Sequence, residues 1–182
     1  LGSGVDVIIP GEKVILHYTV HREENDPYRI KDDYVTALEF LKNGEVVLGT
    51  RSGLVFLNKD GTVMKDDEAL RAFPWKDRID PYVKTIKSAN QGNQLWLGTE
   101  TNGVAAVDLQ VNEVKIYSVA NGNLLFNNNV PALFEDSKKN IWVGGEAIYL
   151  HNKSGQSLIP YNEFGIPNYV ETKNPIMSIF ED

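Results

Sequence analysis

The sequence of 182 residues contains no cysteine, which excludes disulfide bonds and thiolate metal sites. It also lacks any apolar run close to the roughly 20 residues that a membrane-spanning helix needs. Basic residues are in the minority, and the net charge is −7 at pH 7, which argues against a surface that binds nucleic acid phosphates. We therefore expect no nucleic acid partner and no membrane contact within this chain.

Helical periodicity is scarce as well, and residues 66–73 are the best candidate for a short helix. Strand-like segments recur instead. Each opens with a β-branched residue, and the four copies begin at Val35, Val83, Val130 and Ile176, roughly 47 residues apart. A period in the 40s built only from strands is typical of propeller blades. A blade cannot bury both of its faces alone, so the repeat predicts a row of packed blades.

Each copy of the repeat reads as four strands. The innermost strand is mostly apolar on both faces, which predicts burial between neighbouring blades. A polar turn leads to a second strand ending in Gly. Trp96 and Trp142 share one position of this strand, and we interpret them as packing elements rather than ligand contacts. The residues expected to be buried at equivalent positions are Val35, Ala37, Leu38, Ile86, Trp96, Ala132, Leu133, Trp142 and Ile179.

The repeat predicts an all-β protein, a β-propeller fragment of about four four-stranded blades within one segment, residues 1–182. Three complete repeats begin near residues 33, 81 and 129, and partial blades occupy residues 1–31 and 174–182. The outer strands are expected at residues 13–18, 62–64, 113–117 and 157–161, and the last inner strand at residues 176–182.

The two partial blades are complementary. The chain therefore reads either as a piece of a longer propeller or as a complete small protein whose ends join in one composite blade. A piece would expose raw blade faces and strand edges, and we expect it to associate with other blades of the parent propeller. In isolation it would close on itself or exchange strands with a second copy, and we favour self-association between chains.

The sequence lacks motifs typical of catalytic or metal-binding sites. His17 lies in a predicted strand and His21 follows four residues later, which in an extended chain is too far apart for one metal ion. Neither a nucleophile elbow, a phosphate-binding loop nor a zinc-protease motif occurs. Paired acidic residues such as Asp66 and Asp67 read as solvated loop charges. We therefore expect no catalytic residue, no metal site and no cofactor, and no enzymatic activity for this chain.

The repeats resemble those of the two-component regulator propeller family. The resemblance rests on the run from Pro131 to Asp136 followed by Ile141 to Gly144, on Leu95 to Thr99 with Gly103, and on Gly49 to Leu54. It covers nearly the whole chain. Three positions depart from the family pattern, with Val47 in place of Trp, Gly145 in place of Thr and Ala147 in place of Gly.

The resemblance implies a periplasmic sensor region that belongs to a hybrid two-component system, with the membrane helix and histidine kinase elsewhere in the parent protein. It also implies detection of an oligosaccharide or a similar ligand. Two alternatives stay open, because a propeller fold does not determine function. One is a scaffold for protein–protein interaction, and the other is a propeller lyase or glycosidase.

A candidate ligand site follows from propeller geometry. The turns between second and third strands and the loops that return to the next inner strand lie at one pole, where recognition usually occurs. Tyr, Arg, Asn and carboxylate groups suit a glycan-like ligand. The predicted site consists of Arg51, Glu100 and Glu146 from the turns and Tyr34, Tyr82, Asn128 and Asn129 from the return loops, with Ser52, Thr101, Asp33 and Asp80 close by.

Overall fold

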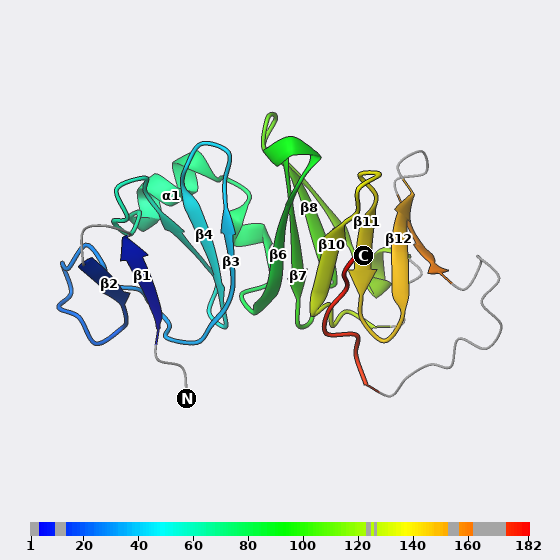
Figure 1. Ribbon diagram of the computed structural model, residues 1–182, viewed down its shortest axis with the longest axis horizontal. Helices are drawn as coiled ribbons and strands as arrows, with labels where there is room; N and C mark the ends of the chain where they lie inside the picture. Colours follow the sequence, from blue (N-terminus) through cyan, green and yellow to red (C-terminus); the bar gives the residue numbers. More distant parts are fainter. Residues whose placement is uncertain (1–3, 10–13, 123–124, 126, 153–156, 162–173) are drawn as a thin grey trace.

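The protein is a row of antiparallel sheets that stand side by side (Figure 1). The computed structural model describes residues 4–9, 14–122, 125, 127–152, 157–161 and 174–182. In this part of the chain the first sheet pairs β1 (Val5–Ile9) with β2 (Val14–Tyr18). The second sheet has the order β3 (Val35–Phe40), β4 (Val46–Thr50) and β5 (Leu54–Leu57).

The next two sheets are complete four-stranded meanders. The third sheet contains β6 (Val83–Ala89), β7 (Gln94–Thr99), β8 (Val104–Asp108) and β9 (Glu113–Tyr117). The fourth contains β10 (Ala132–Glu135), β11 (Ile141–Gly144), β12 (Ile148–Asn152) and β13 (Ser157–Pro160). Each strand pairs with the next one along the chain, which is the strand order of a propeller blade. The predicted all-β propeller fold is confirmed.

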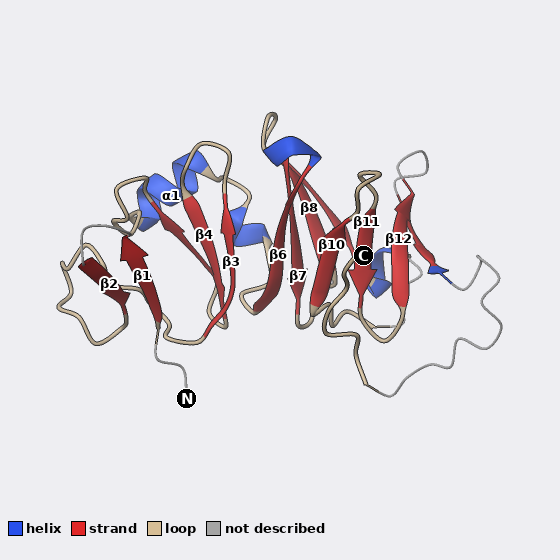
Figure 2. Ribbon diagram, viewed as in Figure 1, coloured by secondary structure: helices blue, strands red, loops and turns tan. Residues whose placement is uncertain are grey.

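Helices are minor elements (Figure 2). The described residues form one α-helix, α1 (Asp66–Ala72), within the segment 66–73 that was predicted as the best helical candidate. Three short 3-10 turns follow, η1 (Lys76–Arg78), η2 (Asn90–Gly92) and η3 (Val119–Asn121). No helix in the described ranges is long and apolar enough to cross a membrane.

The same glycine contact joins successive sheets. A Cβ atom placed on Gly49 would lie 3.0 Å from Val83 Cγ1, and one on Gly98 would lie 2.3 Å from the carbonyl oxygen of Val130. Gly144 meets Ile176 in the same way, at 3.1 Å. The glycine at the end of each second strand therefore admits the first β-branched residue of the next repeat, which explains both the glycine and its spacing.

Two predicted strands are absent. Residues 62–64 form only an isolated bridge between Leu57 and Val63. The chain then leaves the sheet edge because Phe73, just after α1, stacks on Phe56 with ring centroids 4.1 Å apart. Residues 176–182 form no strand. The Ile176 amide donates to the Gly145 carbonyl, just after β11, at 2.8 Å.

The predicted burial is confirmed for only some of the residues expected to be buried. Ile86, Trp96 and Ala132 are buried, whereas Val35, Ala37, Leu133, Trp142 and Ile179 are only partly buried. Leu38 is 40% exposed, contrary to expectation. The two-stranded first sheet packs on Leu48 and Leu57 of the second sheet and leaves Leu38 on β3 uncovered. Trp142 lies on the last described sheet, where no further sheet is described beyond it.

Candidate ligand-recognition site

Three side chains occupy equivalent places just before the inner strands β3, β6 and β10. These are Tyr34, Tyr82 and Asn129. The backbone amide of each donates to the side chain two residues earlier, at 2.8 Å to Asp32, 2.8 Å to Asp80 and 2.9 Å to Asn127. Such Asx turns fix the local backbone before a strand begins. The strands β3, β6 and β10 begin along the lower edge in Figure 1, so the repeat places one polar or aromatic residue per sheet at the same pole.

The turns after the second strands add charged residues at the same pole. Arg51 lies in the β4–β5 turn and Glu100 in the β7–β8 turn. Each turn is closed by the preceding threonine: the Oγ1 of Thr50 and of Thr99 donates to a carbonyl oxygen across the turn, at 2.8 Å and 2.9 Å. The turn geometry therefore holds the charged residue at the turn tip.

These residues form one continuous line of contacts across three sheets. The guanidinium carbon of Arg51 lies 4.8 Å from the ring centre of Tyr34 and 5.5 Å from that of Tyr82. Lys84 Nζ lies 5.8 Å from the Tyr82 ring centre. The same ammonium group donates to Glu100 Oε2 at 2.5 Å and to Asn129 Oδ1 at 2.9 Å. We call this line the cross-blade row; its members are Tyr34, Arg51, Tyr82, Lys84, Glu100 and Asn129.

Five of the seven residues predicted from the sequence lie in the cross-blade row. Asn128 does not, because its side chain accepts from the Val119 amide at 2.8 Å and its carbonyl accepts from the Gly103 amide at 2.9 Å. Glu146 occupies the corresponding turn between β11 and β12. Lys84, one of two lysines in the inner strand β6, was not among the residues predicted from the sequence.

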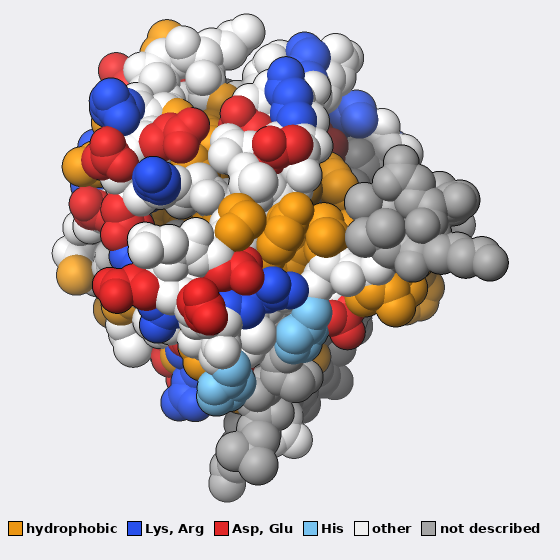
Figure 3. Space-filling view, turned by 90° about the vertical axis from the view of Figure 1, so that its left-hand side faces the viewer, with side chains coloured by type: hydrophobic (Ala, Val, Ile, Leu, Met, Phe, Trp, Pro, Cys, Tyr) orange, Lys and Arg blue, Asp and Glu red, His pale blue; other side chains and the backbone are white. Residues whose placement is uncertain are grey.

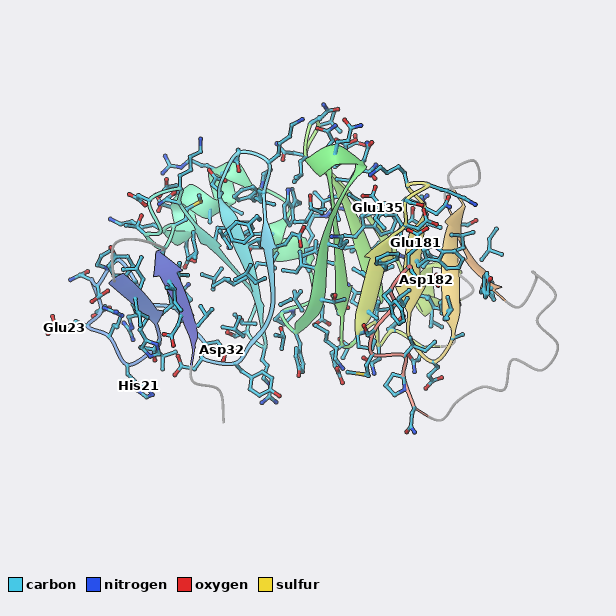
Figure 4. All side chains as sticks on the ribbon, in the orientation of Figure 1. His21, Glu23, Asp32, Glu135, Glu181 and Asp182 are labelled. Carbon is cyan, nitrogen blue, oxygen red and sulfur yellow. The ribbon has the colours of Figure 1, made fainter. Side chains whose placement is uncertain are left out.

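Acidic side chains at the opposite pole have another role. Glu135 and Glu181 lie at the upper ends of the inner-strand segments in Figure 4. Glu135 Oε1 accepts from the Asn90 amide at 2.9 Å, and Glu181 accepts from the amide and hydroxyl of Ser137, both at 2.7 Å. Each carboxylate therefore caps the hairpin of the preceding sheet. His21, Glu23 and Asp32 lie at the other end of the molecule, and no trio of metal-ligating side chains occurs in the described ranges.

A cleft of about 450 Å³ opens between the third and fourth sheets. Trp96, Tyr117 and His151 contribute to its lining, and the Tyr117 hydroxyl lies 3.0 Å from His151 Nε2. Burial raises the pKa of Tyr117 to about 12, so this hydroxyl stays protonated at neutral pH. A second cleft of about 840 Å³ lies between the 20–31 loop and α1. The cross-blade row lines neither cleft and is an open surface.

The consecutive antiparallel sheets define this part of the chain as a segment of a β-propeller. Residues 124–147, which include β10 and β11, match the family model described as two component regulator propeller. This match confirms, for residues 124–147, the resemblance drawn from the sequence. No curated protein matches the sequence.

Solved structures share the fold. The extracellular domain of a hybrid two component system from B. thetaiotaomicron matches with a TM-score of 0.64 and 17% identity, over 87% of this chain and 20% of that one. The extracellular domain of a one component system from the same organism matches with a TM-score of 0.58 and 20% identity, over 77% of this chain and 17% of that one. The chain thus spans about a fifth of the length of these relatives.

An enzyme shares the architecture too. Virginiamycin B lyase from Staphylococcus aureus matches with a TM-score of 0.50 and 14% identity, over 74% of this chain and 42% of that one. At this identity the likeness concerns the fold alone, since propellers host binding, scaffolding and catalysis. The choice among these functions depends on the side chains of the site.

Proposed function

We propose that this chain is a ligand-sensing part of the extracytoplasmic propeller of a two-component signalling receptor, and that the ligand is an oligosaccharide or a similar molecule. The observation that supports this proposal is the cross-blade row. It joins three sheets through side chains that are not needed to close any single sheet. A ligand bound along the row would contact several blades at once. Its binding could therefore be transmitted as a change in the relative positions of the blades.

The chemistry of the row suits a polyhydroxylated ligand. Tyr34 is 40% exposed, so ring surface remains open although Arg51 lies over the ring. Glu100 and Asn129 supply hydrogen-bond acceptors, and Arg51 and Lys84 supply donors. Aromatic faces with a few placed polar groups are typical of small-molecule sites. The row holds no paired nucleophile and base, and we propose binding without catalysis, with the kinase of the receptor outside this chain.

The test uses the complete extracellular region of the parent receptor and a panel of oligosaccharides, with affinities measured by calorimetry. Replacing Arg51 and Tyr82 together by Ala should abolish binding while the thermal unfolding midpoint changes little, because both side chains lie at the surface of the pole. The matched control replaces Arg71 and Phe40 by Ala, an arginine on α1 and an exposed aromatic residue on β3. If the Arg51 and Tyr82 double variant bound with unchanged affinity, the ligand would have to bind elsewhere on the propeller.

A further inference from the structure

The two cations of the cross-blade row are in different states. Lys84 is neutralised, since it contacts the Glu100 carboxylate at 2.5 Å and the Asn129 side chain at 2.9 Å. Arg51 is exposed, and none of the carboxylates in the described residues lies within salt-bridge distance of it. Its contacts among the described residues are with the rings of Tyr34 and Tyr82. Within the described part of the chain, the row therefore contains one oriented guanidinium group without an anionic partner.

Arg51 also departs from the repeat. The corresponding turn positions carry Glu100 in the third sheet and Glu146 in the fourth. The cation is thus a feature of this one blade and not a requirement of the turn. It stands on a protein whose net charge is −7, which would repel a dissolved anion unless a local cation attracted it.

A guanidinium stacked on aromatic rings keeps its N–H donors at the edge of its plane. Those donors form a fork that matches the two oxygens of a carboxylate. Resting on the function proposed above, we propose that the ligand is an acidic oligosaccharide whose uronate carboxylate binds Arg51, with neighbouring sugar rings lying along Tyr34 and Tyr82. The rings hold the guanidinium ready for the carboxylate and lower the conformational entropy that binding would otherwise cost.

The experiment compares uronic acid oligosaccharides (of galacturonate, glucuronate or mannuronate) with the same oligosaccharides after reduction of their carboxylates to neutral hydroxymethyl groups. Affinities are measured by calorimetry on the complete extracellular region. We expect at least one acidic oligosaccharide to bind and its reduced form to bind about ten- to hundredfold more weakly, the loss of one charge-assisted contact. The variant Arg51→Gln should lose the same factor for the acidic form and little for the reduced form.

Arg71→Gln is the matched control and should leave both affinities unchanged, because Arg71 lies on α1 and pairs with Asp67. Equal affinity for acidic and reduced oligosaccharides would overturn the carboxylate assignment while leaving a glycan sensor standing. Arg51-dependent binding of oligoglutamate, with no oligosaccharide bound, would overturn the acidic-sugar ligand and the proposed glycan function together. Binding of acidic sugars that Arg51→Gln does not weaken would place their carboxylate elsewhere.

Discussion

The two repeat tryptophans differ by a single partner residue. Trp142 Nε1 donates to Asp136 Oδ2 at 2.9 Å, whereas Trp96 Nε1 is buried and has no hydrogen-bond partner in the described residues. Ala89 stands in the third sheet where the fourth has Asp136. Burial raises the pKa of Asp136, but the hydrogen bonds from Trp142 and Asn140 outweigh burial and bring this pKa below its ordinary value. The fourth sheet thus has both the tryptophan and its aspartate partner, whereas the third sheet has only the tryptophan.

The first prediction concerns Asp136→Asn. The lowered pKa means that the stabilisation is complete above the ordinary aspartate pKa of about 4 and is lost as the pH falls through the lower folded-state value. We expect the substitution to lower the free energy of unfolding by about 1–3 kcal/mol at pH 7, because a charged acceptor of several hydrogen bonds is lost. The difference from the unaltered protein should shrink below about pH 4.

Urea unfolding from pH 2 to pH 7 would measure this difference. Asp182→Asn is the control. Asp182 ends the run that begins at Ile176, as Asp136 ends the run that begins at Val130, but Asp182 is exposed. A pH-independent effect at Asp136, or an equal effect at Asp182, would mean that the indole hydrogen bond does not stabilise the ionised carboxylate.

At the scale of elements, the contact between each second strand and the next inner strand sets the blade spacing. The second prediction is that Gly98→Ala lowers the free energy of unfolding by about 3 kcal/mol or more, because the new Cβ would meet the backbone oxygen of Val130 at 2.3 Å. Gly49→Ala should cost only about 1 kcal/mol, because its Cβ would meet the side chain of Val83 at 3.0 Å, which can move. Calorimetric unfolding of both variants checks the order, and a reversed order would contradict this account of the glycines.

Strand order could be predicted from the sequence, whereas some tertiary contacts could not. The β-branched starts and the glycines recur in the chain itself, so the strand order and most strand bounds followed from them. The absence of a fourth strand in the second sheet could not be predicted. In its place Phe73 stacks on Phe56 and Trp75 is buried, and such tertiary contacts have no local signal in the sequence. Residues such as Arg51 and Tyr82 could be placed at the pole because they lie at repeat positions, whereas Lys84 lies inside a strand that the repeat marks as core.

At the scale of the whole molecule, the row of sheets leaves an apolar end. The outer face of β1 and β2 faces the viewer in Figure 3, where hydrophobic side chains lie among charged ones. Ile8 and Ile15 pair across this small sheet and are 68% and 62% exposed. Met177 and Phe180 are exposed near the opposite end of the row. Exposed apolar side chains on sheet faces favour association.

The third prediction is that the isolated chain self-associates and that replacing Ile8 and Ile15 by Lys reduces this association. Light scattering over a range of protein concentrations measures it. Val111→Lys is the control, because Val111 is also exposed but lies in the β8–β9 turn. A stable monomer of the unaltered chain at high concentration would refute the prediction, and equal dissociation by Val111→Lys would place the contact elsewhere.

The pole of the cross-blade row is the proposed ligand-binding surface. Hydrogen exchange on the complete extracellular region, with and without the oligosaccharide of highest affinity, tests this proposal. We expect the ligand to slow exchange at the starts of β3 and β6 and in the β4–β5 and β7–β8 turns. Slower exchange confined to the β3–β4, β6–β7 and β10–β11 hairpins at the opposite pole would contradict it.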